Sequence, residues 1–364
     1  MSGITNLFDK QPRAMRGSEE AAMEMAKNRP ESETHITKRP DRIKQYLIHR
    51  MKDFTFDEFS PEYLDKIGMG KELSGVPIPL RDEDREGFKE NGSLPSTLLA
   101  ENMMRVVGID PGFKYQKAYT IFIDKLFGQK AVDNTTRKAK DYADREDYET
   151  ACIYFRAGLV QKFNDLAAMY GYARILRQLY SEGAEKGRKE EYTGTLKAEC
   201  LCYFEMTTEF YPKFDMGWYY LGYMYLNLGL YVKAKLAWQE YLKVGGRILK
   251  DRREIAKRLG QLKDPVEIEK GYNAVLSGRW SKGIDILEPY TESKFNDWWP
   301  LWYYLGVAYA RTGREDEAVK AFKEALKGSP RHIESMEELV DLYNKLGDKT
   351  NTKKYRDKLT LINK

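Results

Sequence analysis

The spacing of apolar and polar residues changes at Ser96. From there on, apolar residues recur every three or four positions, which is the period of a helix that buries one face. One such segment covers 96–107 and ends at the Gly- and Pro-containing stretch 108–112, and the next covers 113–127. No alternating strand pattern follows. The spacing therefore predicts an all-α chain from Ser96 onward.

The N-terminal part of the chain has a different pattern. Eight Gly or Pro residues fall within 68–96, and such spacing disfavours regular structure. A short helix is expected to begin at Pro61, because Ser60 before it suits an N-cap. We therefore predict a partly ordered, loop-rich N-terminal extension over 1–95 and a helical lead-in pair over 96–131.

A twelve-residue segment that begins at Trp218 recurs 84 positions later. The residues shared at equal offsets are Trp218, Leu221, Gly222, Tyr225 and Gly229 in the first copy and Trp302, Leu305, Gly306, Tyr309 and Gly313 in the second. The sequences that follow agree as well: Ala234, Trp238 and Tyr241 correspond to Ala318, Phe322 and Ala325, and Pro330 closes the second copy. This internal repetition decides the expected fold.

Each copy has the composition of a closely packed helix pair. Trp218, Leu221 and Tyr225 lie on one helical face, and Gly222 is expected to lie opposite Ala234 on the second helix. A larger side chain at Gly222 would separate the helices at a cost of about 1–3 kcal/mol. One pair cannot cover its own apolar face, so stability requires stacking on the next pair.

The repeated pattern resembles the tetratricopeptide repeat (TPR), a 34-residue helix-turn-helix with W-x2-L-G-x2-Y, then A-x3-F, then P. The unit 299–332 matches every position, and the unit 215–248 lacks only the closing Pro. More degenerate units are expected at 132–165, 164–214, 264–297 and 333–362. The resemblance, about six repeats over 132–362, implies a right-handed α-solenoid of helix pairs.

Two insertions interrupt the repeat period. The stretch 181–194 is charged and is interpreted as a surface loop, whereas 245–263 holds seven Lys or Arg and two acids. On a helical wheel of the second insertion, Ile248, Ile255, Leu259 and Leu262 share one side, and Lys250, Arg253 and Lys257 project from the other. We expect an extra helix with a solvated basic face. A patch for an acidic partner, RNA or DNA is the alternative, followed by a membrane surface.

Composition excludes several classes of protein. The chain has 61 Lys and Arg against 56 Asp and Glu, three cysteines and three separated histidines. No apolar run of about 18 residues is present, so we expect no membrane span. An odd, small number of cysteines suggests reduced thiols and a cytoplasmic protein. With no catalytic, metal or cofactor constellation in view, we expect a non-enzyme without a cofactor or metal.

The resemblance further implies that exposed positions of the first helix in each pair line an inner groove. The partner-binding residues so predicted are Tyr219, Tyr223, Asn227, Tyr272, Tyr303 and Arg311. Such an aromatic groove suits a peptide or helix with apolar anchors, which predicts a protein–protein interaction adaptor or scaffold. A competing interpretation is that residues 54–80 of the same chain, which include two apolar segments, occupy the groove.

Overall fold

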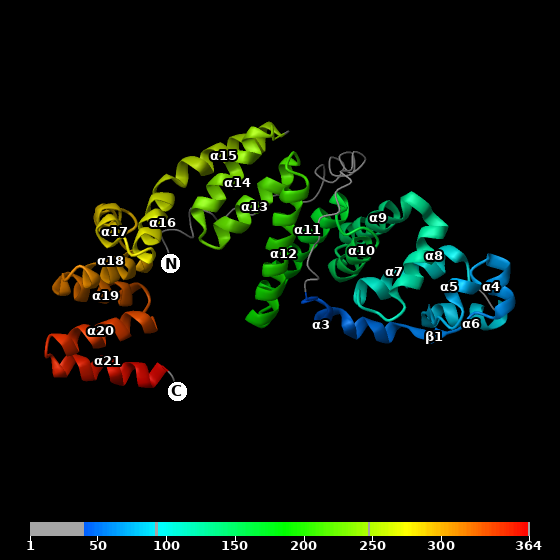
Figure 1. The fold of residues 1–364 in the computed structure, drawn as a ribbon, viewed down its shortest axis with the longest axis horizontal. Coiled ribbons are helices and arrows are strands. Elements are labelled where there is room, and N and C mark those ends of the chain that lie inside the picture. Colours follow the sequence, from blue (N-terminus) through cyan, green and yellow to red (C-terminus); the bar gives the residue numbers. More distant parts are fainter. Residues whose placement is uncertain (1–39, 92–93, 247, 363–364) are drawn as a thin grey trace. The chain divides into compact units, whose positions relative to one another are not determined.

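The computed structural model describes residues 40–91, 94–246 and 248–362, which form two compact units. The first unit contains the described residues up to Leu221, and the second begins at Gly222. The division falls inside helix α13, Asp215–Asn227 (Figure 1). Residues 1–39 of the predicted N-terminal extension lie outside the described residues.

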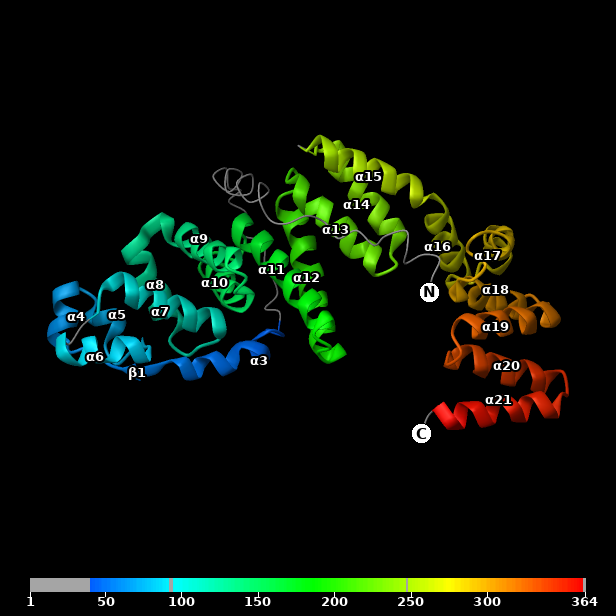
Figure 2. The ribbon, with the colours of Figure 1, turned by 180° about the vertical axis from the view of Figure 1, so that it is seen from behind.

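The first unit starts with short elements and continues with long helices, as both views show (Figure 2). The short elements are α3 (Lys44–Leu47), η1 (Ile48–Asp53), β1 (Thr55–Asp57), α4 (Pro61–Ile67), α5 (Gly70–Leu73), β2 (Ile78–Leu80) and α6 (Asp82–Asn91). The longer elements are α7 (Ser96–Ile109), α8 (Gln116–Phe127), η2 (Gly128–Lys130), α9 (Ala131–Asp144), α10 (Tyr148–Gln161), α11 (Leu166–Glu185) and α12 (Glu190–Phe210).

The stretch 68–96 contains regular structure, contrary to our expectation. Strands β1 and β2 pair in antiparallel fashion, with Thr55 opposite Leu80 and Asp57 opposite Ile78. Along the chain, α5 precedes β2 and α6 follows it. The strand pairing and the burial of Ile78 and Leu80 against the unit supply the order that the local Gly and Pro content does not reveal. Helix α4 begins at Pro61 as predicted, with the Ser60 side chain accepting a hydrogen bond from the Tyr63 amide (3.3 Å).

Residues 54–80 pack on the lead-in helices α7 and α8. Asn102 of α7 donates to the Pro79 carbonyl (3.1 Å), and Tyr119 of α8 donates to the Pro77 carbonyl. Lys125 of α8 donates to the Gly68 carbonyl (2.7 Å). These partners precede the repeat helices that carry the predicted groove residues, so the segment 54–80 has a structural place of its own.

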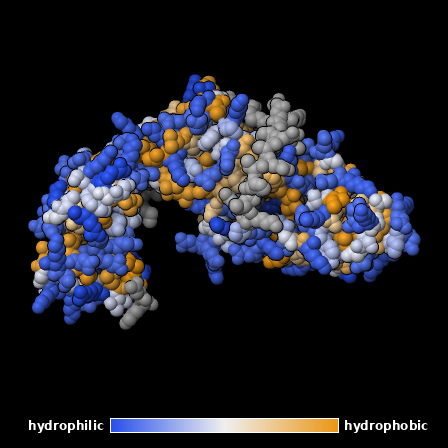
Figure 3. Space-filling view, viewed as in Figure 1, coloured by the Kyte–Doolittle hydropathy of each residue, from blue (hydrophilic) through white to orange (hydrophobic). Residues whose placement is uncertain are grey.

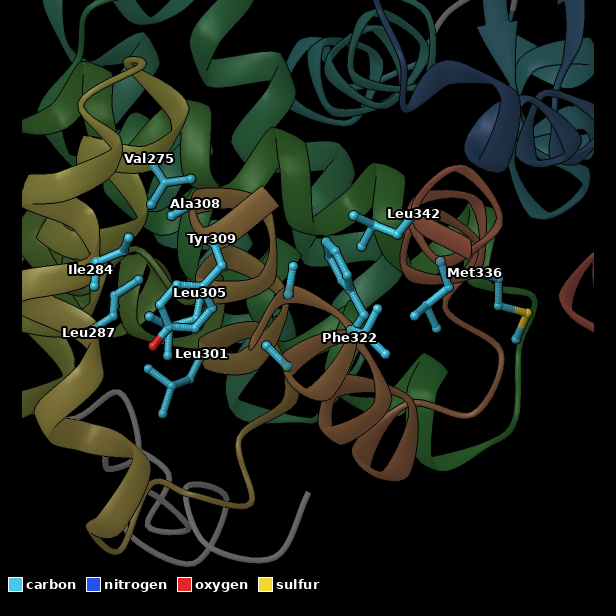
Figure 4. Packing of buried hydrophobic residues seen from close by; sticks show 14 of the residues in the cluster. Val275, Ile284, Leu287, Leu301, Leu305, Ala308, Tyr309, Phe322, Met336 and Leu342 are labelled. Atoms are coloured by element: carbon cyan, nitrogen blue, oxygen red, sulfur yellow. The ribbon is translucent and has the colours of Figure 1, made fainter. Parts of the chain in front are cut away.

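The second unit consists of helix pairs, and the pairs from α16 onward share one buried hydrophobic core. Its elements after α13 are α14 (Tyr231–Lys243), α15 (Leu249–Gln261), α16 (Lys263–Leu276), α17 (Trp280–Leu287), η3 (Glu288–Glu292), α18 (Trp299–Arg311), α19 (Glu315–Gly328), α20 (Ile333–Lys345) and α21 (Lys349–Ile362). Leu301 and Leu305 of α18 meet side chains from α17, α19 and α20 in a single buried cluster (Figure 4). The predicted all-α solenoid of helix pairs is confirmed.

The turn inside each helix pair contains a residue with left-handed backbone. The φ angle is +73° at Gly229, +73° at Gly278, +77° at Gly313 and +74° at Gly347. Gly187 (φ +64°) and Glu146 (φ +62°) hold the same place in the turns α11–α12 and α9–α10. The pairs α9/α10, α11/α12, α13/α14, α16/α17, α18/α19 and α20/α21 therefore correspond to the six expected repeats. Glu146 has a conformation that costs most non-glycine residues about 1–2 kcal/mol.

The closest approach within a pair is not to the alanine we expected. A Cβ atom added at Gly306 would come 2.8 Å from the Phe322 ring, and one at Gly222 would overlap the Trp238 indole. The glycine of the first helix thus makes room for the large aromatic residue of the second helix, which lies one turn beyond Ala234 or Ala318. The two helices of a pair cross closely at this glycine, as expected, but the glycine faces an aromatic ring and not an alanine.

The two insertions have different outcomes. The stretch 181–194 is not a loop, because α11 extends to Glu185 and α12 begins at Glu190. Close packing at Gly183, where an added Cβ would lie 2.9 Å from the Tyr192 ring, holds these longer helices together. The stretch 245–263 forms the expected extra helix, α15, which contacts α14 and α16.

Candidate functional site

Tyr223 is buried beneath α15 and does not line an open groove. Its side chain is 4% exposed, and its ring packs edge-to-face on Trp238 at 5.0 Å. The hydroxyl donates to Glu254 (2.8 Å), and the Arg258 guanidinium lies 4.9 Å from the ring centroid. The extra helix α15 covers this position, which sequence spacing alone placed at the surface.

Tyr219 is also buried, at 3% exposed, and its ring meets that of Tyr220 edge-to-face at 5.2 Å. Asn227 and Arg311, by contrast, are exposed at the ends of α13 and α18. Arg311 forms an ion pair with Glu338 of α20 (3.2 Å). Of the six predicted partner-binding residues, these two are the most accessible.

Tyr272 and Tyr303 are partly buried and belong to one row of rings that runs from α14 past α16 and α18 to the N-cap of α20. We call this the aromatic row; it consists of Tyr231, Trp298, Tyr272, Tyr304, Tyr303 and His332. Tyr272 stacks on Tyr304 at 4.7 Å, and Tyr303 meets His332 edge-to-face at 4.7 Å. The structure therefore brings Tyr272 and Tyr303 into one continuous surface feature, with α16 and α18 as its frame.

Each end of the aromatic row is fixed by hydrogen bonds. Glu269 of α16 accepts a hydrogen bond from the Val232 amide (2.7 Å) at the start of α14. Burial raises the pKa of Glu269, and the amide hydrogen bonds oppose that shift. At the other end, His332 caps α20 by accepting a hydrogen bond from the Ser335 amide (3.2 Å). The rings are thus held in place before any partner arrives.

Tyr272 presents a polar atom that the fold leaves unsatisfied. Its hydroxyl is buried and has no hydrogen-bond partner among the described residues. Burial raises the pKa of Tyr272, so the phenol stays neutral. A buried hydroxyl without a partner costs stability.

Exposed aliphatic residues accompany the row. Leu276, at the end of α16, is 68% exposed, and Val307 and Ala310 of α18 are partly exposed. In Figure 3, hydrophobic patches interrupt the hydrophilic surface of the second unit on the face shown. Leu276 could have been noted from the sequence, because it occupies a groove position, but its exposure depends on where neighbouring helices end.

The basic residues of α15 face solvent. Lys250, Arg253 and Lys257 are exposed and form no ion pair with any described residue. Ile255 and Leu262 are fully buried, but Ile248 is 44% exposed and does not share their side as the helical wheel suggested. Ile248 precedes the first helical residue, so the wheel does not apply to it.

The structure also shows a polar clamp that sequence reasoning missed. Arg156 of α10 is 5% exposed, and its two terminal nitrogens donate to the Asp41 carboxylate, Nη2 at 2.6 Å and Nη1 at 3.0 Å. The same guanidinium donates to the Gly108 carbonyl (2.6 Å). Desolvation of the Asp41 carboxyl raises its pKa, but the hydrogen bond and charge of Arg156 outweigh this and leave the pKa of Asp41 lowered. No local signal joins residues 115 positions apart.

The described residues contain no cluster of three or more His, Cys, Asp or Glu side chains placed to hold a metal ion. Among the same residues, no helix has the length and apolar content needed to cross a membrane.

Comparison with known proteins identifies one repeat directly. Residues 299–332 match the family model described as tetratricopeptide repeat. A comparison with curated proteins finds no match. Among solved structures, the chain is similar to the "MamA RS-1 ArsTM double mutant" at 16% identity, with 52% of this chain and 94% of that chain covered and a TM-score of 0.26.

Two further structures give similar values. "MamA 41-end from Desulfovibrio magneticus RS-1" is 17% identical, with coverage of 52% and 92% and a TM-score of 0.25. "Crystal structure of YrrB: a TPR protein with an unusual peptide-binding site" is 15% identical, with coverage of 57% and 91% and a TM-score of 0.26. The family-model match and the six equivalent helix pairs, not these scores, identify the repeat.

Proposed function

Because residues 299–332 match the tetratricopeptide repeat and further helix pairs of the chain share its geometry, we propose that the protein is a non-catalytic adaptor that holds another protein on its second unit. The observation that carries this proposal is the aromatic row, a set of ring contacts continuous from α14 to the start of α20 with partly exposed members. Large aromatic residues held rigid by their neighbours lose little entropy on binding, which is why they dominate protein interfaces.

The row favours a ligand with apolar anchors. Tyr272, Tyr303 and the exposed Leu276 offer apolar contact. Asn227 and Arg311 add polar contacts at the helix ends. A peptide in extended or helical form with two or three apolar side chains has the chemistry to occupy such a surface.

Tyr223 supports the second unit from within. Tyr223 holds Glu254 and Arg258 of α15 and so fixes that helix against α13 and α14. We therefore assign direct contact with the partner to Tyr272, Tyr303, Asn227 and Arg311, and a positioning role to Tyr223. Tyr219 is buried in the first unit and is given no role in this site.

An affinity measurement tests the adaptor proposal. Wild type and the variants Leu276→Glu and Leu361→Glu would be used to capture partners from the native host, and the affinity of the recovered partner would then be measured for each. Leu361 is 72% exposed on the last helix and serves as the matched control. We expect Leu276→Glu to weaken binding at least tenfold and Leu361→Glu to leave it unchanged. Equal affinities for all three proteins would refute the proposal.

A second candidate function uses the basic face of α15. Lys250, Arg253 and Lys257 are exposed without ion-pair partners among the described residues, which favours binding to RNA or DNA. The test compares retention of wild type and an Arg253→Glu, Lys257→Glu variant on RNA and DNA at low and high salt. Loss of retention in the variant and steep salt dependence are expected; equal retention dismisses the idea.

We place the protein in the cytoplasm, on the basis of its thiols. Cys152 and Cys200 are buried, and burial raises the pKa of Cys152 to about 12. Such thiols behave as small apolar residues of the core and suit a reducing compartment. Fractionation of native cells with detection of the endogenous protein tests this placement.

A further inference from the structure

The first unit contains a cavity of about 280 Å³ that the adaptor function does not use. It lies between residues 43–49 and the helices α10, α11 and α12. All of its lining residues belong to the first unit, whereas the aromatic row belongs to the second. The cavity is therefore a separate feature of the fold.

Burial separates the floor of the cavity from its mouth. Ile43, Leu47, Cys152 and Leu196 line it and are at most 3% exposed. Burial raises the pKa of Cys152 to about 12, so its thiol is neutral and adds to the apolar lining. The floor thus favours an apolar group.

Two tyrosines shape the cavity. Tyr46 and Tyr192 both line it and meet edge-to-face, with ring centroids 4.8 Å apart. The Tyr46 hydroxyl donates to Thr195 (3.4 Å), which holds the ring from the α12 side. Aromatic edges arranged in this way suit a flat ring as the apolar group.

The roof of the cavity is a strap, residues 41–53, that is fixed on both sides. At one side the Asp41 carboxylate binds the buried Arg156 (2.6 Å). At the other, Arg50 binds Glu149 of α10 (2.9 Å). The strap is therefore held at both ends over an incompletely filled space.

The charged residues at the mouth favour an acidic ligand. Glu149 is already engaged by Arg50 (2.9 Å) and lies 3.4 Å from His49. Arg188 is exposed, lies 5.0 Å from the Tyr192 ring centroid, and has no ion pair with any described residue. The Arg188 guanidinium can therefore donate hydrogen bonds to a ligand. The Glu149 carboxylate is already paired with Arg50.

We propose that this cavity binds a small aromatic carboxylate, with its ring between the strap and α12 and its carboxylate on Arg188. The volume fits a body of one or two fused rings, since an engineered apolar cavity of about 150 Å³ accommodates benzene. Binding beneath the strap also links occupancy to the Asp41–Arg156 clamp.

Titration calorimetry of the full chain with two probes tests the proposal. Indole-3-acetate and indole-3-acetamide share one apolar body and differ in charge. Wild type is expected to bind the acetate at least tenfold more tightly, and Arg188→Gln is expected to abolish that difference. Absence of binding by both probes, or an unchanged preference in Arg188→Gln, would overturn the proposal.

Variants that fill or loosen the cavity locate the site. Leu179, which lines the cavity and is only partly buried, is changed to Trp, and Ile121→Trp on α8, 47% exposed, is the control. Leu179→Trp should abolish acetate binding and Asp41→Asn should weaken it several-fold, while Ile121→Trp leaves it unchanged. Circular dichroism verifies folding, and Leu179→Phe replaces the Trp variant if that one unfolds. Wild-type affinity in a folded, filled variant contradicts the assignment.

Discussion

The two units share the turns and crossings of the repeated helix pair, but they differ in the contacts that accompany them. In the second unit, successive pairs share glycine turns, small-residue crossings and stacked rings, so the same local solution recurs along the chain. In the first unit, much of the organisation depends on polar contacts between distant segments. Arg156 joins Asp41 to α10, and Glu101 of α7 accepts hydrogen bonds from Lys138 (2.6 Å) and Tyr154 (2.8 Å).

The two units therefore offer different kinds of binding site. A repeated unit with regular crossings presents a long surface, and in the second unit that surface carries the aromatic row. A unit clamped by buried ion pairs encloses space beneath a strap instead. Four changes are expected to separate the two kinds of unit, and their effects decrease from the first to the last.

The largest effect is expected from the clamp of the first unit. Asp41→Ala leaves the Arg156 guanidinium, 5% exposed, without its carboxylate, which should lower the free energy of unfolding by about 3 kcal/mol. Lys44→Ala is the control, since Lys44 is 41% exposed in its pair with Asp110 and should contribute less than about 1 kcal/mol. Denaturant unfolding measures both, and equal losses would show that the clamp is not special.

A tight crossing should dominate the second unit. Gly306→Ala places a Cβ 2.8 Å from the Phe322 ring, and we expect a loss of about 1–3 kcal/mol in unfolding free energy. Gly260→Ala on α15 is the matched control, because nothing lies within 4 Å of its added Cβ. Thermal unfolding of both variants provides the measurement. A harmless Gly306→Ala would mean that the crossing is looser than described.

The cap of α20 should make the second unit sensitive to acid. Burial lowers the pKa of His332, although Glu334 opposes the shift. The folded-state pKa of His332 is below the unfolded value of about 6.5. The stability that the neutral His332 cap contributes is therefore fully present above about pH 6.5 and is lost as the pH falls through the folded-state pKa. Protonation of the capping Nδ1 should cost about 1 kcal/mol. Unfolding at pH 8 and pH 5 should reveal this loss in wild type and not in His332→Asn, whose cap does not titrate; matching pH dependences would contradict it.

The smallest effect concerns the one turn that lacks glycine. Glu146 has φ +62°, and Glu146→Gly should raise the unfolding free energy by about 1 kcal/mol by relieving strain. The reciprocal change, Gly313→Ala at φ +77°, should lower it by a similar amount. Opposite shifts in thermal midpoint are expected, and shifts of the same sign would show that the two turns are not equivalent.

The sequence predicts the second unit far better than the first. Trp302, Leu305 and Gly306 carry their structural roles in local spacing, because a helix pair is decided by residues within about 34 positions. The contact between Asp41 and Arg156, and the strand pairing of Thr55 with Leu80, join segments that share no pattern. Such contacts follow from tertiary packing and have no local signature.

The candidate site was predictable in part for the same reason. Tyr272 and Tyr303 follow from repeat positions, and the structure places both in the aromatic row. Tyr223 occupies an equivalent position, yet α15 covers it through Glu254 and Arg258. The sequence predicted that α15 is a helix, but not which tyrosine it would bury, because the direction of an inserted helix depends on contacts outside the repeat.

The central claim, that the aromatic row of the second unit holds a partner protein, is tested most directly by site-specific photo-crosslinking in the native host. A photoreactive phenylalanine analogue is placed at Leu276, at Val307 or, as a control, at Leu361. We predict that positions 276 and 307 crosslink to the same protein and that position 361 does not. Crosslinking of that protein from position 361 to the same extent, or no crosslink from either position in the row, would contradict the account.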